Sequence, residues 1–73
     1  SMELFDMMSH FGCHTDCEAS TVSGWVMASL GKIPAVGDCF TADGLHAVVT
    51  RVDANHPEEI LVRPVSADAP DGE

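Results

Sequence analysis

The segment that most constrains the fold is an amphipathic stretch over residues 21–30, which leads into a linker that contains glycine and proline. The positions of its predicted buried face recur at the spacing of an α-helix. They are Val22, Trp25, Val26, Ser29 and Leu30. Ser20 or Thr21 can cap the start of such a helix, and Gly31 can take the left-handed conformation at its end. We therefore predict a core helix over residues 22–30.

The linker predicts where the chain changes direction. Ile33-Pro34 forces an extended exit from the helix, and Gly37-Asp38 favours a turn. Residues 39–42 then predict a short strand. Asp43-Gly44 is a strong signal for a two-residue hairpin turn, and a longer strand over residues 45–52 follows it.

The longer strand has apolar residues on both faces, which is typical of a central strand. We expect one face to carry Leu45, Ala47 and Val49, and the other to carry Val48 and Val52. Residues 53–57 predict a turn that also includes Glu58. The last strand is predicted over residues 60–63, and Pro64 ends its pairing.

A second amphipathic segment occupies residues 2–11. Its apolar positions are Leu4, Met8 and Phe11, with Phe5 beside them. Two helical turns are not stable alone in water, so this segment is expected to pack on the core helix and the sheet. Cys13 to Ala19 predict a connecting loop. On the core helix, Gly24 and Ala28 would let another element approach closely.

These elements predict an α+β fold in which two short helices pack on a small antiparallel meander of about three strands. We expect one domain over residues 1–65 and a disordered acidic tail over residues 66–73. A core of this size supplies only ~3–5 kcal/mol of net stability, so contacts with partners can matter.

The order of these signals resembles the transporter-associated domain of the CorC/HlyC family. The resemblance covers roughly Leu4 to Val65 and rests on Leu30-Gly31-Lys32-Ile33-Pro34, Val36-Gly37-Asp38 and Asp43-Gly44-Leu45. It implies a cytoplasmic piece of a larger, multi-pass membrane protein, placed after a transmembrane domain and a pair of CBS domains. It also implies an accessory role in ion transport, within a magnesium/cobalt efflux protein or a hemolysin-like protein. Members of the family commonly begin with a further strand, and without it a sheet edge is left open.

Composition excludes several classes of function. Three basic residues against twelve acidic ones give a formal charge of -9, which disfavours binding to nucleic acid or anionic membranes. Hydrophobic residues make up 45% of the chain, which favours folding. No apolar run is long enough to cross a bilayer, so we expect a soluble fragment without direct membrane insertion. Three cysteines cannot form a closed disulfide framework, and an odd number fits a reducing compartment.

Two clusters contain residue types that bind metal ions. His10, Cys13, His14 and Cys17 have the donor types of a zinc site, but Gly12 interrupts the helix that would place them on one face. Oxygen donors for a hard cation occur in turns, at Asp38, Asp43, Asp53, Glu58 and Glu59. Asp43 and Asp53 lie at opposite ends of the long strand and cannot share an ion. Because aspartate is common in turns for local reasons, we assign no metal site.

Catalysis and cofactor binding also have no residues assigned to them. About the Asp43-Gly44 turn, Thr41 pairs with His46 and Cys39 with Val48, so Cys39 lies diagonal to His46. A core cysteine beside a half-exposed histidine is the commoner arrangement, and no oxyanion donor or dinucleotide fingerprint accompanies the pair. Trp25 is expected in the core, with its indole N–H bonded to a carbonyl group.

The sequence therefore predicts a noncatalytic accessory domain that acts by protein contact. The expected partners are the CBS domains and membrane domain of its own parent chain, and a second copy could form a homodimer. Two alternatives stay open, which are a small-ligand or divalent-cation sensor that binds its ion weakly, and a self-association module.

Overall fold

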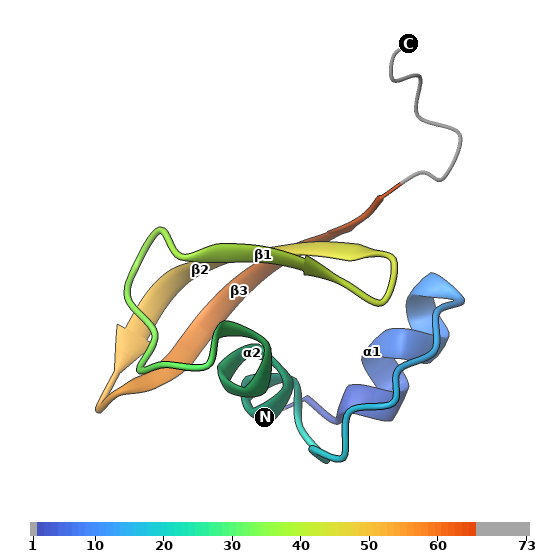
Figure 1. Cartoon of the computed structure of the whole chain (residues 1–73), viewed down its shortest axis with the longest axis horizontal. Coiled ribbons are helices and arrows are strands. Elements are labelled where there is room, and N and C mark those ends of the chain that lie inside the picture. The colour runs from blue at the N-terminus through green and yellow to red at the C-terminus, as the bar shows by residue number, and fades with distance from the viewer. Residues whose placement is uncertain (1, 66–73) are drawn as a thin grey trace, which may run out of the picture.

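The computed structural model describes residues 2–65. Its elements, in chain order, are α1 (Leu4–Phe11), α2 (Val22–Leu30), β1 (Cys39–Ala42), β2 (Leu45–Asp53) and β3 (His56–Pro64). The strands form one antiparallel sheet in the order β1-β2-β3, and Figure 1 shows both helices on one side of it. The predicted α+β meander with a central long strand is confirmed. The predicted tail over residues 66–73 lies outside the described residues.

Helix α2 has the predicted ends and most of the predicted buried face. The hydroxyl of Thr21 accepts the Gly24 N–H at 3.1 Å, and Gly31 ends the helix in the left-handed conformation with φ of 70°. Val22, Trp25 and Val26 are buried and Leu30 is partly buried. The prediction was wrong for Ser29, which is exposed, so the buried face narrows toward the end of the helix.

Close approach to α2 occurs at Gly24 and not at Ala28. A methyl group at Gly24 would lie 2.9 Å from the Cβ atom of Ala19, so this position cannot carry a side chain unless the loop before the helix moves. Ala28 is exposed. The element that needs the glycine is therefore the preceding loop, which packs back against the first turn of its own helix.

Helix α1 begins two residues later than predicted and buries a different set of side chains. Met7 is buried with Leu4 and Met8, whereas Phe5, which the pattern placed beside the apolar positions, is 77% exposed. Residue 5 is rotated 100° from residue 4 on a helix, which turns it away from the buried stripe. The residues before α1 are extended, because Leu4 N–H bonds to the carbonyl of Ser20 and Val22 N–H to that of Met2.

The core joins both helices to the central strand. Trp25, which is 1% exposed, packs edge-on against Phe40 with ring centroids 4.9 Å apart. The buried apolar side chains are Leu4, Met7, Met8, Val22, Trp25, Val26, Leu45, Ala47 and Val49. Their shared cluster confirms that α1 packs on α2 and the sheet.

Strand β3 begins at His56, four residues earlier than predicted. The turn consists of Ala54 and Asn55 alone, which have φ values of 50° and 67°. Pro57 therefore lies in the strand, opposite Val52, instead of in the turn. β3 is an edge strand, and an edge strand tolerates proline because a missing N–H on the free side costs no ladder hydrogen bond.

An irregularity in β2 changes the face on which its last residues lie. The pairing register shifts between Val49 and Arg51 and again between Arg51 and Val52. An extra residue at such a bulge reverses the alternation of side chains beyond it. Val52 consequently packs against the core, and the prediction that it shares a face with Val48 was wrong.

Candidate contact surfaces

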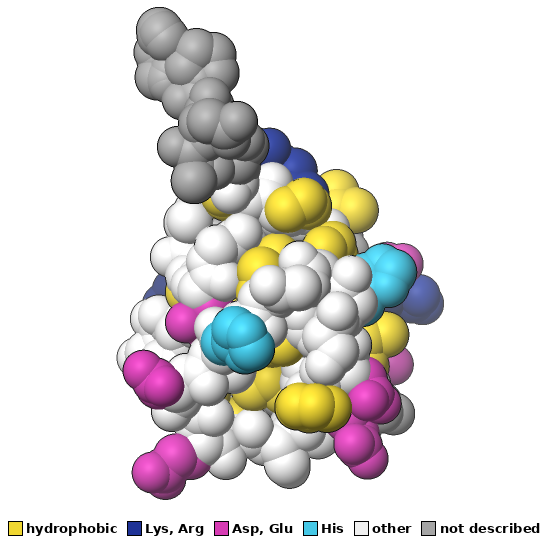
Figure 2. All heavy atoms as spheres, turned by 90° about the vertical axis from the view of Figure 1, so that its right-hand side faces the viewer, with side chains coloured by type: hydrophobic (Ala, Val, Ile, Leu, Met, Phe, Trp, Pro, Cys, Tyr) yellow, Lys and Arg dark blue, Asp and Glu magenta, His cyan; other side chains and the backbone are white. Residues whose placement is uncertain are grey.

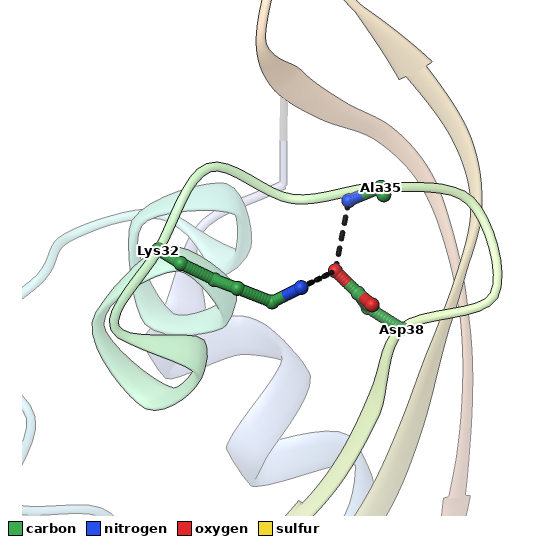
Figure 3. A network of polar contacts seen from close by, with 3 residues as sticks. All are labelled: Lys32, Ala35 and Asp38. Atoms are coloured by element: carbon green, nitrogen blue, oxygen red, sulfur yellow. Dashed lines mark hydrogen bonds and ion pairs between the residues drawn. The ribbon is translucent and has the colours of Figure 1, made fainter.

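The linker between α2 and β1 is held by a compact polar network. The Asp38 carboxylate accepts a hydrogen bond from the Ala35 N–H and pairs with the Lys32 ammonium group through the same oxygen, each at 2.9 Å (Figure 3). The Lys32 ammonium group and then the Ala35 N–H hold the pKa of Asp38 below its ordinary value of 3.8. The side chain of Asp38 is thus used inside its own loop.

The same loop, residues 32–38, is joined to the sheet by its backbone. The N–H of Gly37 bonds to the carbonyl of Val49, and the N–H of Val49 bonds to the carbonyl of Asp38, both at 2.8 Å. Yet the loop leaves two branched apolar side chains exposed, Ile33 at 63% and Val36 at 67%. It therefore presents apolar side chains on a backbone that is already ordered.

The turn between β1 and β2 is attached to the core helix. The indole N–H of Trp25 donates to a carboxylate oxygen of Asp43 at 3.0 Å. We expected a carbonyl acceptor, and the structure has a turn carboxylate in its place. Asp43, at the exposed tip of the hairpin, thereby satisfies the one polar atom of a buried tryptophan.

The edge of the sheet at β3 borders an apolar groove of about 740 Å³. Met7 and Phe11 of α1 line one wall, and Ile60 and Val62 of β3 line the other. Leu61, between them in sequence, points to the opposite face and is 65% exposed. Within residues 2–65, no strand pairs with β3 on its outer side.

A second groove, of about 710 Å³, lies between α1 and the loop of residues 12–20. Cys13, His14 and Cys17 line it. His10 packs edge-on against Phe11 with ring centroids 5.0 Å apart, and the Cys13 thiol donates to the Phe11 carbonyl at 3.6 Å. In the part of the chain that the structure describes, no three histidine, cysteine or acidic residues are placed to hold a metal ion. The four candidate zinc donors therefore do not form a ligand set there.

Three of the acidic turn residues have separate partners. Asp38 pairs with Lys32, and Asp43 accepts from Trp25. One carboxylate oxygen of Glu59 accepts from the Thr50 hydroxyl at 3.4 Å. The described acids, Asp53 and Glu58 included, form no group of three that could share an ion.

The face of the sheet opposite the helices carries the cysteine and histidine that were weighed for catalysis. Cys39 pairs with Val48 and Thr41 with His46, as predicted. The Thr41 hydroxyl lies 2.9 Å from Nδ1 of His46. Cys39 is exposed, so the expectation of a core cysteine was wrong. The reason is the strand alternation, which turns Cys39 to the side that no helix covers.

Acidic residues dominate the charged surface. Figure 2, which views the molecule from the α1 side, shows acidic side chains around the lower part of this face and hydrophobic side chains among them. The sequence analysis missed the exposed apolar pair in the linker, and it expected an open sheet edge without placing that edge at β3. The available signal for the exposed pair was two aliphatic residues in a linker that contains glycine and proline. The available signal for the edge was the alternation of charged residues with Leu61.

Comparison with known families decides how these surfaces are interpreted. Residues 1–66 match the model of the CorC_HlyC family, which is described as "Transporter associated domain". The chain belongs to the CorC/HlyC transporter-associated domain family. The resemblance that the linker motif indicated is thus confirmed.

A relative of this CorC/HlyC domain is the UPF0053 protein sll0260 of Synechocystis. It is 39% identical over 49 residues, which make up 67% of this chain and 11% of the relative. The chain thus matches about a ninth of the length of that protein. No helix among residues 2–65 has the length and apolarity that a membrane crossing requires.

Two solved structures share the fold and 29% of the sequence. One is described as a region associated with an Mg²⁺ and Co²⁺ transporter (CorC) from Neisseria meningitidis, and the other as a conserved protein of unknown function from Haemophilus influenzae. Each aligns with a TM-score of 0.78 over 89% of this CorC/HlyC domain and 82% of the solved chain.

Proposed function

We propose that this chain is a noncatalytic accessory domain of a membrane ion-transport protein, on its cytoplasmic side. Membership of the transporter-associated family supports the setting, and the Neisseria structure links a similar region to Mg²⁺ and Co²⁺ transport. We propose further that the domain works by contact with other parts of its parent protein, the CBS domains and the membrane domain. Ligand chemistry and catalysis have no part in this proposal.

The observation that carries the contact proposal is the ordered loop of residues 32–38. Ile33 and Val36 are exposed, although hydrogen bonds to Asp38 and Val49 hold the backbone of this loop in place. An ordered loop loses little conformational entropy when a partner covers it, so its apolar side chains contribute more of their burial to binding. The net charge of -9 favours a partner surface that carries basic residues.

Such a contact can regulate transport if it is made better in one state of the transporter than in another. A surface shifts a conformational equilibrium only by its difference in affinity for the two states. The domain would then favour the state in which Ile33 and Val36 are more completely buried.

The test compares amide hydrogen exchange of this domain alone with that of the same residues inside the longer parent protein. We expect slower exchange over residues 32–38 in the parent. The variant Val36→Asp should abolish that protection and change transport, whereas Phe5→Asp, the same kind of charge change at a still more exposed position, should not. Equal exchange of the loop in both proteins would overturn the proposal.

Direct sensing by the domain predicts a different result. Magnesium, cobalt, calcium or zinc ions, or adenine nucleotides, would raise the thermal unfolding midpoint of the isolated domain at fixed protein concentration. On the contact proposal none of them does. A saturable rise with one of these ligands would replace contact with sensing as the role of the domain.

A further inference from the structure

The groove between α1 and the loop of residues 12–20 has two walls that are fastened to each other at both ends. Figure 1 shows the loop returning beside the helix. Near the end of α1 the N–H of Cys13 bonds to the Met8 carbonyl at 2.8 Å, and at its start the N–H of Leu4 bonds to the Ser20 carbonyl at 3.0 Å. The groove of about 710 Å³ is therefore formed before any partner binds.

The loop that forms one wall also packs against the rest of the domain at two glycines. A methyl group on Gly44 would lie 3.5 Å from the Cys13 sulfur, and one on Gly24 would lie 2.9 Å from the Cβ atom of Ala19. The first contact joins the start of the loop to the turn between β1 and β2, and the second joins its end to α2. A groove whose walls are held in this way loses little conformational entropy when a partner binds in it.

The groove has an apolar floor and an exposed aromatic side chain at its rim. Leu4 and Met8 of α1 line it from buried positions, and the partly buried Cys13 and Cys17 line the wall opposite them. Phe5 lines the groove as well, although most of its side chain is exposed. A large apolar side chain inserted here would cover Phe5 and be buried itself, which is favourable in proportion to the apolar area removed from water.

The charged side chains around this groove are acidic. The sequence has no lysine or arginine before Lys32, whereas Glu3 lines the groove and Asp16 and Glu18 belong to its loop wall. Both loop acids are exposed, and each is adjacent in sequence to Cys17, which lines the groove. They therefore lie within about 8 Å of it, the Debye length at physiological salt. Figure 2 views this side of the molecule and shows acidic side chains around hydrophobic ones.

We propose that this groove binds a segment of a separate partner protein in which a large apolar side chain is flanked by lysine or arginine residues. The apolar side chain would lie between Phe5 and the loop, and the basic residues would lie near Glu3, Asp16 and Glu18. Complementary charge selects such a segment over an acidic one with the same apolar side chain. The groove shares no residue with the loop of residues 32–38, so this recruiting surface adds to the proposed function and does not depend on it.

Amide chemical shifts of this domain, titrated with a designed peptide, test the proposal. The probe is a blocked peptide in which two leucines stand between two pairs of lysines. We expect saturable shifts for Phe5 and residues 12–20, and not for the strands β2 and β3. Two control peptides replace the leucines by alanine or the lysines by glutamate. Each should bind about tenfold more weakly, because each lacks one half of the complementary chemistry.

Variants of the domain separate this groove from general attraction to an acidic protein. Phe5→Ala removes the exposed aromatic side chain and Glu18→Lys reverses a charge, and each should weaken binding of the lysine–leucine peptide about fivefold. Leu61→Ala and Glu58→Lys make matched changes at exposed positions of β3 and should leave the affinity unchanged. Thermal unfolding of each variant establishes that it is folded.

Several results would overturn the proposal. They are the absence of shifts at Phe5 and residues 12–20, equal binding of the three peptides, and groove variants that bind as well as their controls. Shifts of the same residues that appear as the protein concentration rises without peptide would also overturn it, because the occupant would then be a second copy of the domain. None of these results depends on the exchange of residues 32–38, so the two proposals fail independently.

Discussion

The two hairpin turns that bound β2 have the same backbone conformation but different sources of stability. Asp43 and Gly44 have φ values of 55° and 82°, and Ala54 and Asn55 have values of 50° and 67°. Two successive residues with positive φ are typical of the type I′ turn, whose twist matches that of paired strands. The first pair has residues that favour this conformation, whereas the second begins with alanine, for which it is strained.

The difference shows that one turn type can be specified in two ways. Asp43 favours the turn locally and also accepts the indole N–H of Trp25, so the first turn is attached to the core. Ala54 is exposed and lies next to paired strands whose register leaves it no other conformation. The first turn is therefore favoured by its own residues and reinforced by a long-range contact, whereas the second depends on the strands that it connects.

Removal of the tryptophan tests the attachment of the first turn to the core and should have the largest effect. Trp25→Ala removes the largest buried side chain and should cost ~3–5 kcal/mol. This equals the whole stability expected of so small a domain, ~3–5 kcal/mol. We expect a largely unfolded chain by far-ultraviolet circular dichroism. Phe5→Ala is the control, and it should remain folded because Phe5 is exposed.

Replacement of Asp43 separates the turn from the helix without emptying the core. Asp43→Ala leaves the buried indole N–H without its acceptor and puts alanine at positive φ, for a loss of ~2 kcal/mol. Asp43→Asn keeps a side-chain oxygen and tolerates positive φ, so it should lose less than half as much. Urea denaturation measures both. Equal losses would show that the carboxylate charge, and not the acceptor or the backbone, is what matters.

The second turn should respond in the opposite direction. Ala54→Asn replaces a strained alanine by a residue that accepts positive φ, and it should stabilise the domain by ~0.5–1 kcal/mol. The matched control is Ala28→Asn on the exposed side of α2, which should destabilise by ~0.5 kcal/mol because asparagine is a poorer helix former. Urea denaturation measures the free energy of unfolding of both variants. A loss of stability at Ala54 would mean that strain does not distinguish the two turns.

The linker network should make the smallest contribution, and its dependence on pH identifies it. The folded-state pKa of Asp38 is lowered, so its contribution is present above the unfolded value of 3.8 and is lost as the pH falls through the folded value. The thermal midpoints of the wild type and Asp38→Asn should thus differ at neutral pH and converge below about pH 4. A difference that is constant with pH would exclude the ionised carboxylate as its source.

Much of the local structure could be predicted because short-range chemistry specifies it. The caps of α2 at Thr21 and Gly31, the turn at Asp43-Gly44 and the pairing of Cys39 with Val48 depend on residues close in sequence. The start of β3 could not be predicted in this way. Its turn contains alanine, and proline follows within the strand, so the local signals favoured a longer loop.

The candidate surfaces were less predictable, because exposure depends on what packs from elsewhere in the chain. Ile33 and Phe5 are apolar by sequence, yet no other element among residues 2–65 covers them. Residue type alone cannot separate an uncovered apolar side chain from a buried one. The candidate zinc residues show the same limit, since closeness in sequence did not bring three of them together among residues 2–65.

The sequence by itself determined the element types, the family and the acidic character, because periodicity, capping residues, a linker motif and net charge are local or additive properties. The tertiary structure alone decided three further features. They are the contact between Trp25 and Asp43, the side of the sheet on which Val52 lies, and the lack of a partner strand on the outer side of β3 within residues 2–65. Each depends on how segments distant in sequence pack and pair, and no single segment encodes that.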